Sequence, residues 1–185
     1  DTWALSMRLR GQRGTDGLVP QIWPVGSVVV LLDETLERVP ISASKRGVGR
    51  FYRVGPGSKA VDHPAYRDLE HTATGVALRP LQPVHLRAAR ASSGDVSVSW
   101  FRQTRIDGDL WDLSGVPLGE VSEAYQIRVR AGGAVRRETQ VATSSWSYSA
   151  TDQLADGVTG AFTVEVAQIS DRFGPGLFGE VTLDD

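Results

Sequence analysis

Acidic residues gather at one point of the chain where a divalent cation is the first chemistry to consider. Residues 107–112 read DGDLWD, and alternate carboxylates of this kind can converge on Ca²⁺. An EF-hand-type loop, however, needs an oxygen ligand at its fifth position, Gly at its sixth and Glu at its twelfth. Trp111, Asp112 and Leu118 stand at those positions. We therefore expect a structured turn with Asx hydrogen bonds, and no metal.

The histidines and the other carboxylates give no catalytic pattern. His63, His71 and His85 are scattered, without the i, i+4 spacing that a zinc site on a helix requires. Glycan hydrolysis needs two carboxylates, one with a raised pKa. The candidate pairs lie in polar stretches that favour a solvated surface: Glu120 with Glu123, and Asp68 with Glu70.

Motifs for other enzyme classes are also missing from the sequence. No G-x-S-x-G nucleophile elbow is present, and no glycine pattern fits a bound nucleotide. We expect a chain that is not an enzyme and that binds no cofactor.

Two aromatic residues in predicted loops are better placed to bind a partner. Trp111 and Phe173 fall in loops and are flanked by charged residues, so they can stack on a sugar or anchor a protein. In the alternative, Trp111 folds back and covers the open end of the domain. The candidate contact residues are Asp109, Trp111, Asp112, Arg172 and Phe173.

Composition limits the class of partner. The 185 residues carry a net charge of -2 with a sequence pI near 5.9, so no overall field favours nucleic acid. Cys is absent, which leaves no disulfides and no thiolate metal ligands. No apolar run is long enough to span a bilayer, and no secretory leader is apparent. Because the chain opens with Asp1, we expect a processed product or a fragment of a longer protein.

The first part of the chain predicts a small β domain over residues 1–81. Its signals are period-two alternation at residues 3–10, a continuous apolar run at residues 28–32 typical of a buried strand, and shorter strands at 36–41, 50–54 and 72–78. Residues 58–70 have room for one helical turn. The two prolines of RPLQP (residues 79–83) predict an extended connector and a domain boundary.

Residues 82–185 alternate more clearly and predict a two-sheet antiparallel β-sandwich. Seven short strands with turn signals between them suit that architecture, and Gly132 and Gly133 mark one hairpin. Trp100 and Tyr125 lie on the apolar faces and are expected in the core, whereas His85 lies on a polar face. The predicted strands contain residues 84–88, 96–100, 125–129, 135–141, 146–148, 162–166 and 181–183.

Residues 83–183 resemble a fibronectin type III domain. The resemblance rests on Trp100 at the end of the second strand, YQIRV at 125–129, FTVEV at 162–166 and the loop SDRFGPG at 170–176. It implies a two-sheet antiparallel β-sandwich. Phe162 stands where that family usually has a corner tyrosine, so the hydroxyl that would bond the backbone is missing.

Nearly the whole chain is similar to the C-terminal region of gene transfer agent and siphophage host-specificity proteins. These are hub proteins of the tail tip or baseplate. The similarity rests on LRGQRGT (9–15), VLLD (30–33), YRVGP (52–56), LRPLQPVHLR (78–87) and WFRQTRIDGD (100–109). It implies a virion or particle component at the tail tip, trimeric in the particle, that contacts other tail or baseplate proteins and a host receptor or envelope polysaccharide.

Two functions from different classes therefore remain open at this point. The first is a structural and binding module of a phage-like tail tip. The alternative is a carbohydrate-binding accessory module of a secreted polysaccharide-active enzyme. The arginine-rich face expected from Arg128, Arg130, Arg136 and Arg137 suits an acidic partner or envelope polysaccharide, although such faces are more often only solvated.

Overall fold

The computed structural model describes residues 9–12, 14–31, 33–106 and 115–184. The chain forms two compact units. One is Pro20–Val76, and the other combines Asp1–Val19 with Ala77–Asp185. We call them the hairpin unit and the sandwich unit.

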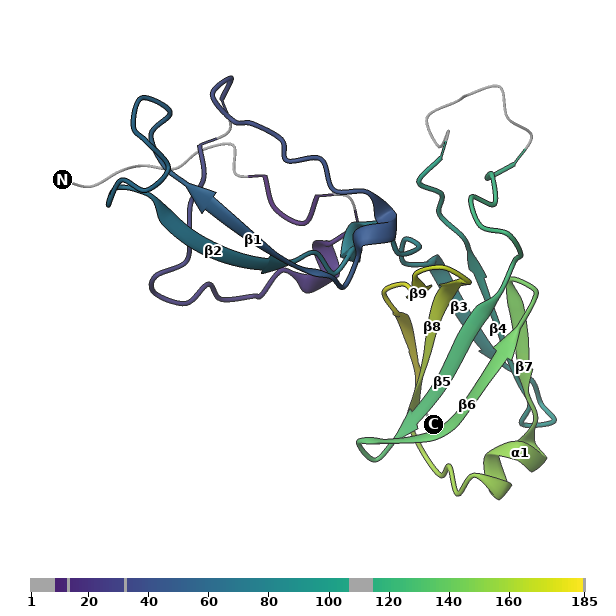
Figure 1. Ribbon diagram of the computed structural model, residues 1–185. Helices are drawn as coiled ribbons and strands as arrows, with labels where there is room; N and C mark the ends of the chain where they lie inside the picture. The colour runs from purple at the N-terminus through teal and green to yellow at the C-terminus, as the bar shows by residue number, and fades with distance from the viewer. Residues whose placement is uncertain (1–8, 13, 32, 107–114, 185) are drawn as a thin grey trace. The chain divides into compact units, whose positions relative to one another are not determined.

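The hairpin unit is built around two antiparallel strands, β1 (Gly49–Val54) and β2 (Arg67–Thr72) (Figure 1). The unit also holds a 3-10 turn at Ala43–Lys45, and another 3-10 turn, Val76–Leu78, spans its end. The expected strand at residues 50–54 is confirmed as part of β1. None of the unit's described residues is buried.

Other strand predictions for this unit are wrong. The apolar run at 28–31 is not in a strand, and its four side chains are all exposed, with Val28 at 83% and Leu31 at 76%. Residues 36–41 form no strand, and no helical turn occurs within 58–70, where β2 begins instead. An apolar run signals a buried strand only when a second layer covers it, and none of the described residues of this unit forms such a layer.

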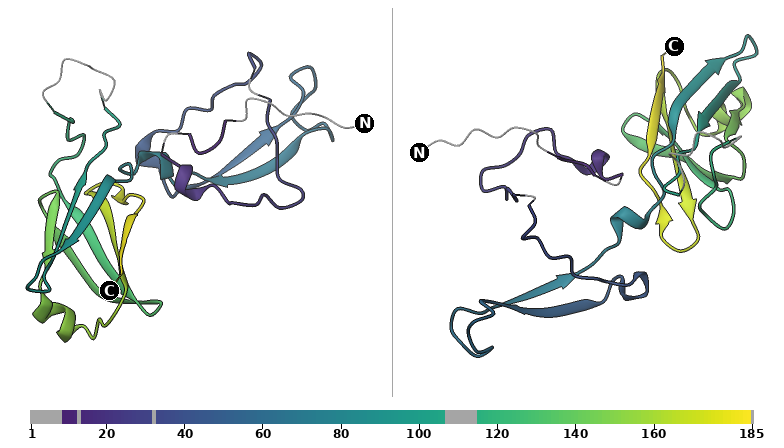
Figure 2. Two further views of the ribbon diagram at one scale, coloured as in Figure 1. Left: turned by 180° about the vertical axis from the view of Figure 1, so that it is seen from behind. Right: turned by 90° about the horizontal axis from the view of Figure 1, so that it is seen from above.

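The sandwich unit contains the seven predicted strands, all confirmed. Three form one sheet in the order β3-β4-β7, and four form the other in the order β10-β8-β5-β6, with the two-residue β9 paired to β8. Figures 1 and 2 show the two sheets from three sides. The bounds are β3 Val84–Arg90, β4 Val96–Phe101, β5 Tyr125–Ala131, β6 Ala134–Val141, β7 Ser145–Tyr148, β8 Phe162–Ser170, β9 Gly174–Pro175 and β10 Gly179–Leu183, with helix α1 at Ala150–Ala155 and a 3-10 turn at Asp16–Leu18.

The core lies between these sheets because inward and outward side chains alternate along each central strand. In β4 the burial alternates strictly, and Trp100 is 3% exposed. Its ring meets Tyr125 edge to face, with 5.1 Å between ring centroids. Tyr148 and Phe162 make a similar contact at 5.8 Å. Apolar side chains fill the space between them: Val96, Val98, Ile127, Val129, Val164, Val166 and Leu183.

Two glycines close the β5–β6 hairpin as the sequence predicted. Gly132 and Gly133 have φ of 59° and 78°, and both values lie in the left-handed region that favours glycine. A two-residue turn of this kind matches the twist of the flanking strands, so it fixes the register of β5 on β6.

The connector before β3 belongs to the sandwich unit, although the sequence placed the division between residues 81 and 82. Pro80 and Pro83 are buried there. Gly176 lies so close to Pro80 that a β-carbon on it would come within 2.3 Å of the Pro80 carbonyl oxygen. Gln82 donates a hydrogen bond to the Phe178 carbonyl oxygen at 3.1 Å. These contacts fix the start of β3 beside the start of β10.

Gly176→Ala is expected to lower the free energy of unfolding by about 1–3 kcal/mol, because the new methyl group must displace backbone. Chemical denaturation of the full chain measures this. Gly115→Ala is the control, since no atom of the described residues lies within 4 Å of its added β-carbon. Equal stability of the two variants would contradict the close packing of Gly176 on Pro80.

Hydrogen exchange is expected to separate the two units. Amides of β1 and β2 should exchange far faster than those of β5 and β8, because an isolated hairpin without buried side chains opens at little cost. Mass spectrometry of peptides from Gly49–Val54 and Phe162–Ser170 provides the comparison. Similar protection in both peptides would contradict this expectation.

Candidate functional site

The β4–β5 loop, residues 102–124, leaves the sandwich at the end opposite α1 (Figures 1 and 2). Two ion pairs join the two sides of its base. Arg102 Nη1 lies 3.2 Å from Glu123 Oε2, and Arg105 Nη2 lies 2.7 Å from Glu120 Oε1. Arg102 also donates to the Val116 carbonyl oxygen. These contacts hold the two sides of the loop base together, and we call residues 102–106 and 115–124 the loop stem.

The carboxylates of this stem were expected to be solvated, and for Glu120 that expectation is wrong. Its side chain is 8% exposed and is held by Arg105. Glu123 is also engaged, because Tyr125 donates its hydroxyl hydrogen to Glu123 Oε1 at 2.8 Å. Burial and this bond raise the pKa of Tyr125 to about 12. The predicted pair Asp68 and Glu70 lies elsewhere, on strand β2 of the hairpin unit.

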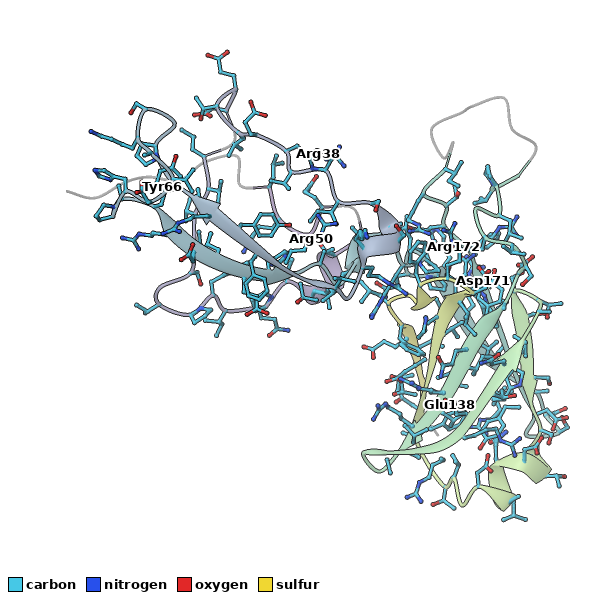
Figure 3. All side chains as sticks on the ribbon, viewed as in Figure 1. Arg38, Arg50, Tyr66, Glu138, Asp171 and Arg172 are labelled. Carbon is cyan, nitrogen blue, oxygen red and sulfur yellow. The ribbon has the colours of Figure 1, made fainter. Side chains whose placement is uncertain are left out.

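The structure describes two of the five predicted contact residues. Asp109, Trp111 and Asp112 lie outside the described residues. Arg172 is exposed and Phe173 is half-buried. The Arg172 guanidinium carbon lies 5.6 Å from the Phe173 ring centroid. Figure 3 shows Asp171 and Arg172 at the end of the sandwich from which the β4–β5 loop leaves.

Beneath the loop stem is a small hollow that sequence reasoning missed. It is lined by residues of the connector, the loop stem and β8, among them Leu81, Thr104, Arg105, Leu118 and Gln168. Gln168 is 1% exposed, and its Oε1 accepts no hydrogen bond from the described residues. The one sequence signal for this hollow was the alternation along β8, which turns the Gln168 side chain inward.

The other end of the sandwich is closed by α1 and a buried hydroxyl network. Tyr148 donates to Asp156 Oδ2 at 2.6 Å, and Arg137 Nε donates to the same oxygen at 2.6 Å. Arg137 also reaches Asp152 at 2.8 Å. Tyr148 thus places a hydrogen-bonding hydroxyl beside Phe162, the residue that stands at the corner position without one. Arg137 lowers the pKa of Asp156 below its ordinary value of 3.8.

Hydrogen bonds tie α1 to the β3–β4 turn. The Gln153 amide donates to the carbonyl oxygens of Gly94 and Tyr148, each at 3.0 Å. Asp95 Oδ1 accepts from the Ala150 N–H at 2.8 Å, and Ser149 caps the helix by accepting from the Asp152 N–H. The polar groups at this end hydrogen-bond to one another, which indicates a structural role. We call this network the clasp; its residues are Asp95, Arg137, Tyr148, Ser149, Asp152, Gln153 and Asp156.

The predicted arginine-rich face is largely neutralised. Arg128 pairs with Glu138 at 2.7 Å, and Arg130 pairs with Glu165 at 2.7 Å. Arg137 does not lie with them, because it pairs with the inward-facing Val129 and its side chain bonds to Asp156 at the end of α1. Arg136 donates to the Ala131 carbonyl oxygen. On this face, each of the outward arginines Arg128 and Arg130 is therefore paired with a glutamate. Glu138 is labelled in Figure 3.

Within the described ranges, no three His, Asp or Glu side chains come together as metal ligands. None of the helices in those ranges has the length and apolar character needed to cross a membrane.

No model of a protein family matches this sequence, and no curated protein matches it. Solved structures do match, and FN domains are among them. The rat CD45 extracellular region, domains d3–d4, is 11% identical over 100% of this chain and 87% of that chain, with a TM-score of 0.43. The FN5 domain of Drosophila Lar is 18% identical over 57% of this chain and 95% of its own, with a TM-score of 0.36. An FN3 domain of human collagen XX is 23% identical over 56% and 91%, with a TM-score of 0.35.

Acid is expected to destabilise the clasp. A carboxylate whose pKa is lower in the folded state contributes stability above its unfolded pKa and loses it as the pH falls through the folded value. The contribution of Asp156 should therefore be complete at neutral pH and decline below about pH 4. Asp156→Asn should lower the free energy of unfolding at pH 7 by about 1–3 kcal/mol and flatten the acid decline.

Denaturant titrations between pH 2 and pH 7 test this expectation. Tyr148→Phe is the matched variant, because it removes one partner of Asp156 and keeps Arg137. It should cost about 1–2 kcal/mol and leave most of the acid dependence in place. An Asp156→Asn profile parallel to that of the unaltered chain would contradict the assignment.

Proposed function

We propose that this chain is a non-enzymatic structural and binding module of a phage-like tail tip or baseplate. In this role the sandwich is a rigid support, and the β4–β5 loop contacts a host surface or a neighbouring tail protein. The chain's partners would be tail or baseplate proteins around a threefold axis, and its location the particle.

The loop stem is the observation that carries the proposal. Arg102–Glu123 and Arg105–Glu120 join the base of a long loop, and binding residues are often found on loops that a rigid scaffold holds in place. Fixing the base of a loop lowers the entropy that its residues lose on binding. The predicted contact residues Asp109, Trp111 and Asp112 belong to this loop by sequence.

The engagement of the acidic groups supports a role without catalysis. Glu120 and Glu123 bond to arginines, and Arg137 lowers the pKa of Asp156, which favours the charged form of that carboxylate. A general acid would instead need an apolar surrounding that favours the protonated form. The sequence similarity over residues 79–109 points to the tail tip as the setting.

A particle experiment tests the proposal. A tagged copy of the chain is expressed in cells that produce the particles, and the particles are purified on a density gradient. We expect the tag to sediment with tail proteins and to be found at the tail tip by immunogold microscopy. A chain that stays at the top of the gradient would contradict the proposal.

Loop function is tested in the same particles. Replacing residues 107–114 by a short Gly-Ser linker should leave incorporation intact and reduce adsorption to host cells. Glu138→Gln, on the outer face of the β10–β8–β5–β6 sheet, is the control and should change neither. If the isolated chain instead binds free oligosaccharide and loses it on Trp111→Ala, the accessory module of a polysaccharide-active enzyme is favoured.

A further inference from the structure

The two outer faces of the sandwich differ in charge chemistry. On the β10–β8–β5–β6 sheet, Arg128 and Arg130 are each paired with a glutamate. The strands of the other sheet, β3, β4 and β7, contain no Asp or Glu. Their one arginine on the outer face, Arg87, is exposed and has no ion pair among the described residues. This face is therefore open to an anion.

Rows of serine hydroxyls cross the same face. Ser97 lies opposite Ser147, and Ser99 lies opposite Ser145 on the neighbouring strand. All four are exposed. Of these four hydroxyl groups, only that of Ser97 makes a hydrogen bond to the described residues, and it donates to the Ala89 carbonyl oxygen at 3.3 Å. The left view of Figure 2, from behind, has this sheet in front. We call this surface the serine face; its residues are Arg87, Ser97, Ser99, Phe101, Ser145 and Ser147.

An aromatic pair stands at one end of the serine face. Phe101 is 64% exposed although it lies in a strand, and the His85 ring meets it edge to face at 6.1 Å. A bulge between Val84 and Arg87 places His85 there, and its φ of 52° is left-handed. Glycine would adopt that conformation more readily than histidine. The local backbone thus carries strain at the residue that sets a ring beside Phe101.

We infer that the serine face binds an acidic polysaccharide. The C–H face of a sugar ring would pack on Phe101 and His85, the Arg87 guanidinium would pair with a carboxylate of a uronic acid, and the serine hydroxyls would bond to sugar hydroxyls. This inference goes beyond the loop contact proposed above by assigning a second binding surface to the sandwich itself, and it rests on that proposal for its biological setting.

The chemistry of the face favours a polysaccharide over other polymers. Serine is depleted in the centres of protein–protein interfaces, which rely on apolar anchors. Nucleic acid binding needs several unpaired cations along a track. The strands of this face turn only one arginine, Arg87, outward, and the chain as a whole has a net charge of -2. Hydroxyl rows on strands about 4.8 Å apart suit a flat, extended chain of sugar rings.

Binding by the full chain to polygalacturonate tests the inference, with neutral dextran and a single-stranded DNA oligonucleotide as comparison polymers. Affinity is measured by retardation in native gels that contain the polymer. We expect retardation by polygalacturonate, weakened about tenfold by Arg87→Gln because a charge-assisted pair is lost. Phe101→Ala should weaken it about fivefold.

Matched variants separate a built site from general attraction. Arg136→Gln removes the same charge from the other sheet and should leave affinity unchanged. His85→Gly should keep the bulge, unfold no earlier in denaturant, and still weaken binding. Equal loss in Arg136→Gln and Arg87→Gln, tighter binding of the oligonucleotide, or no retardation by polygalacturonate would each overturn the inference.

The two proposals fail in different ways. A chain that joins tail particles and ignores polygalacturonate contradicts only the serine face. A chain that binds polygalacturonate through Arg87 and Phe101 but never joins particles contradicts only the tail-tip setting.

Discussion

The rest of the sandwich depends on the packing of aromatic side chains between its two sheets. Trp100 against Tyr125 and Tyr148 against Phe162 bring rings from opposite sheets into edge contact at two levels of the core. Fully burying such rings contributes several times the energy of a surface ion pair. Because these aromatic residues point into the core, the residues next to them in each strand must point outward, and the pairing register of the strands is fixed. Binding functions are then confined to loops and outer faces.

Polar networks at both ends complete this core. At one end Arg102 and Arg105 hold the glutamates of the loop stem, and at the other Arg137 holds Asp156. In each case a tyrosine hydroxyl at the edge of the core donates to a carboxylate. The arginines that looked like a binding face in the sequence are mostly structural. The outer face that is free of carboxylates lies on the other sheet.

The sequence predicted the sandwich well because inward and outward positions alternate along its strands, most strictly in β4 and β5. It failed for residues 28–31, since an apolar run does not reveal whether a second layer covers it. Pairing across the loop stem, such as Arg105 with Glu120, depends on loop geometry, and spacing alone does not report that. The bulge at His85 was equally hidden, because a histidine in a strand gives no sign of a left-handed φ.

The placement of β3 beside β10 has a mechanical consequence. The two strands start at the same end of the sandwich, where the Gln82 amide donates to the Phe178 carbonyl oxygen, and they run in the same direction. Residue 80 therefore lies before the start of β3, and residue 184 lies after the far end of β10. A pull between residue 80 and residue 184 therefore acts along both strands and shears one past the other. Shear must break many contacts at once, whereas peeling breaks them in turn. Tension along the chain would therefore load the packing contacts between β3 and β10 in shear.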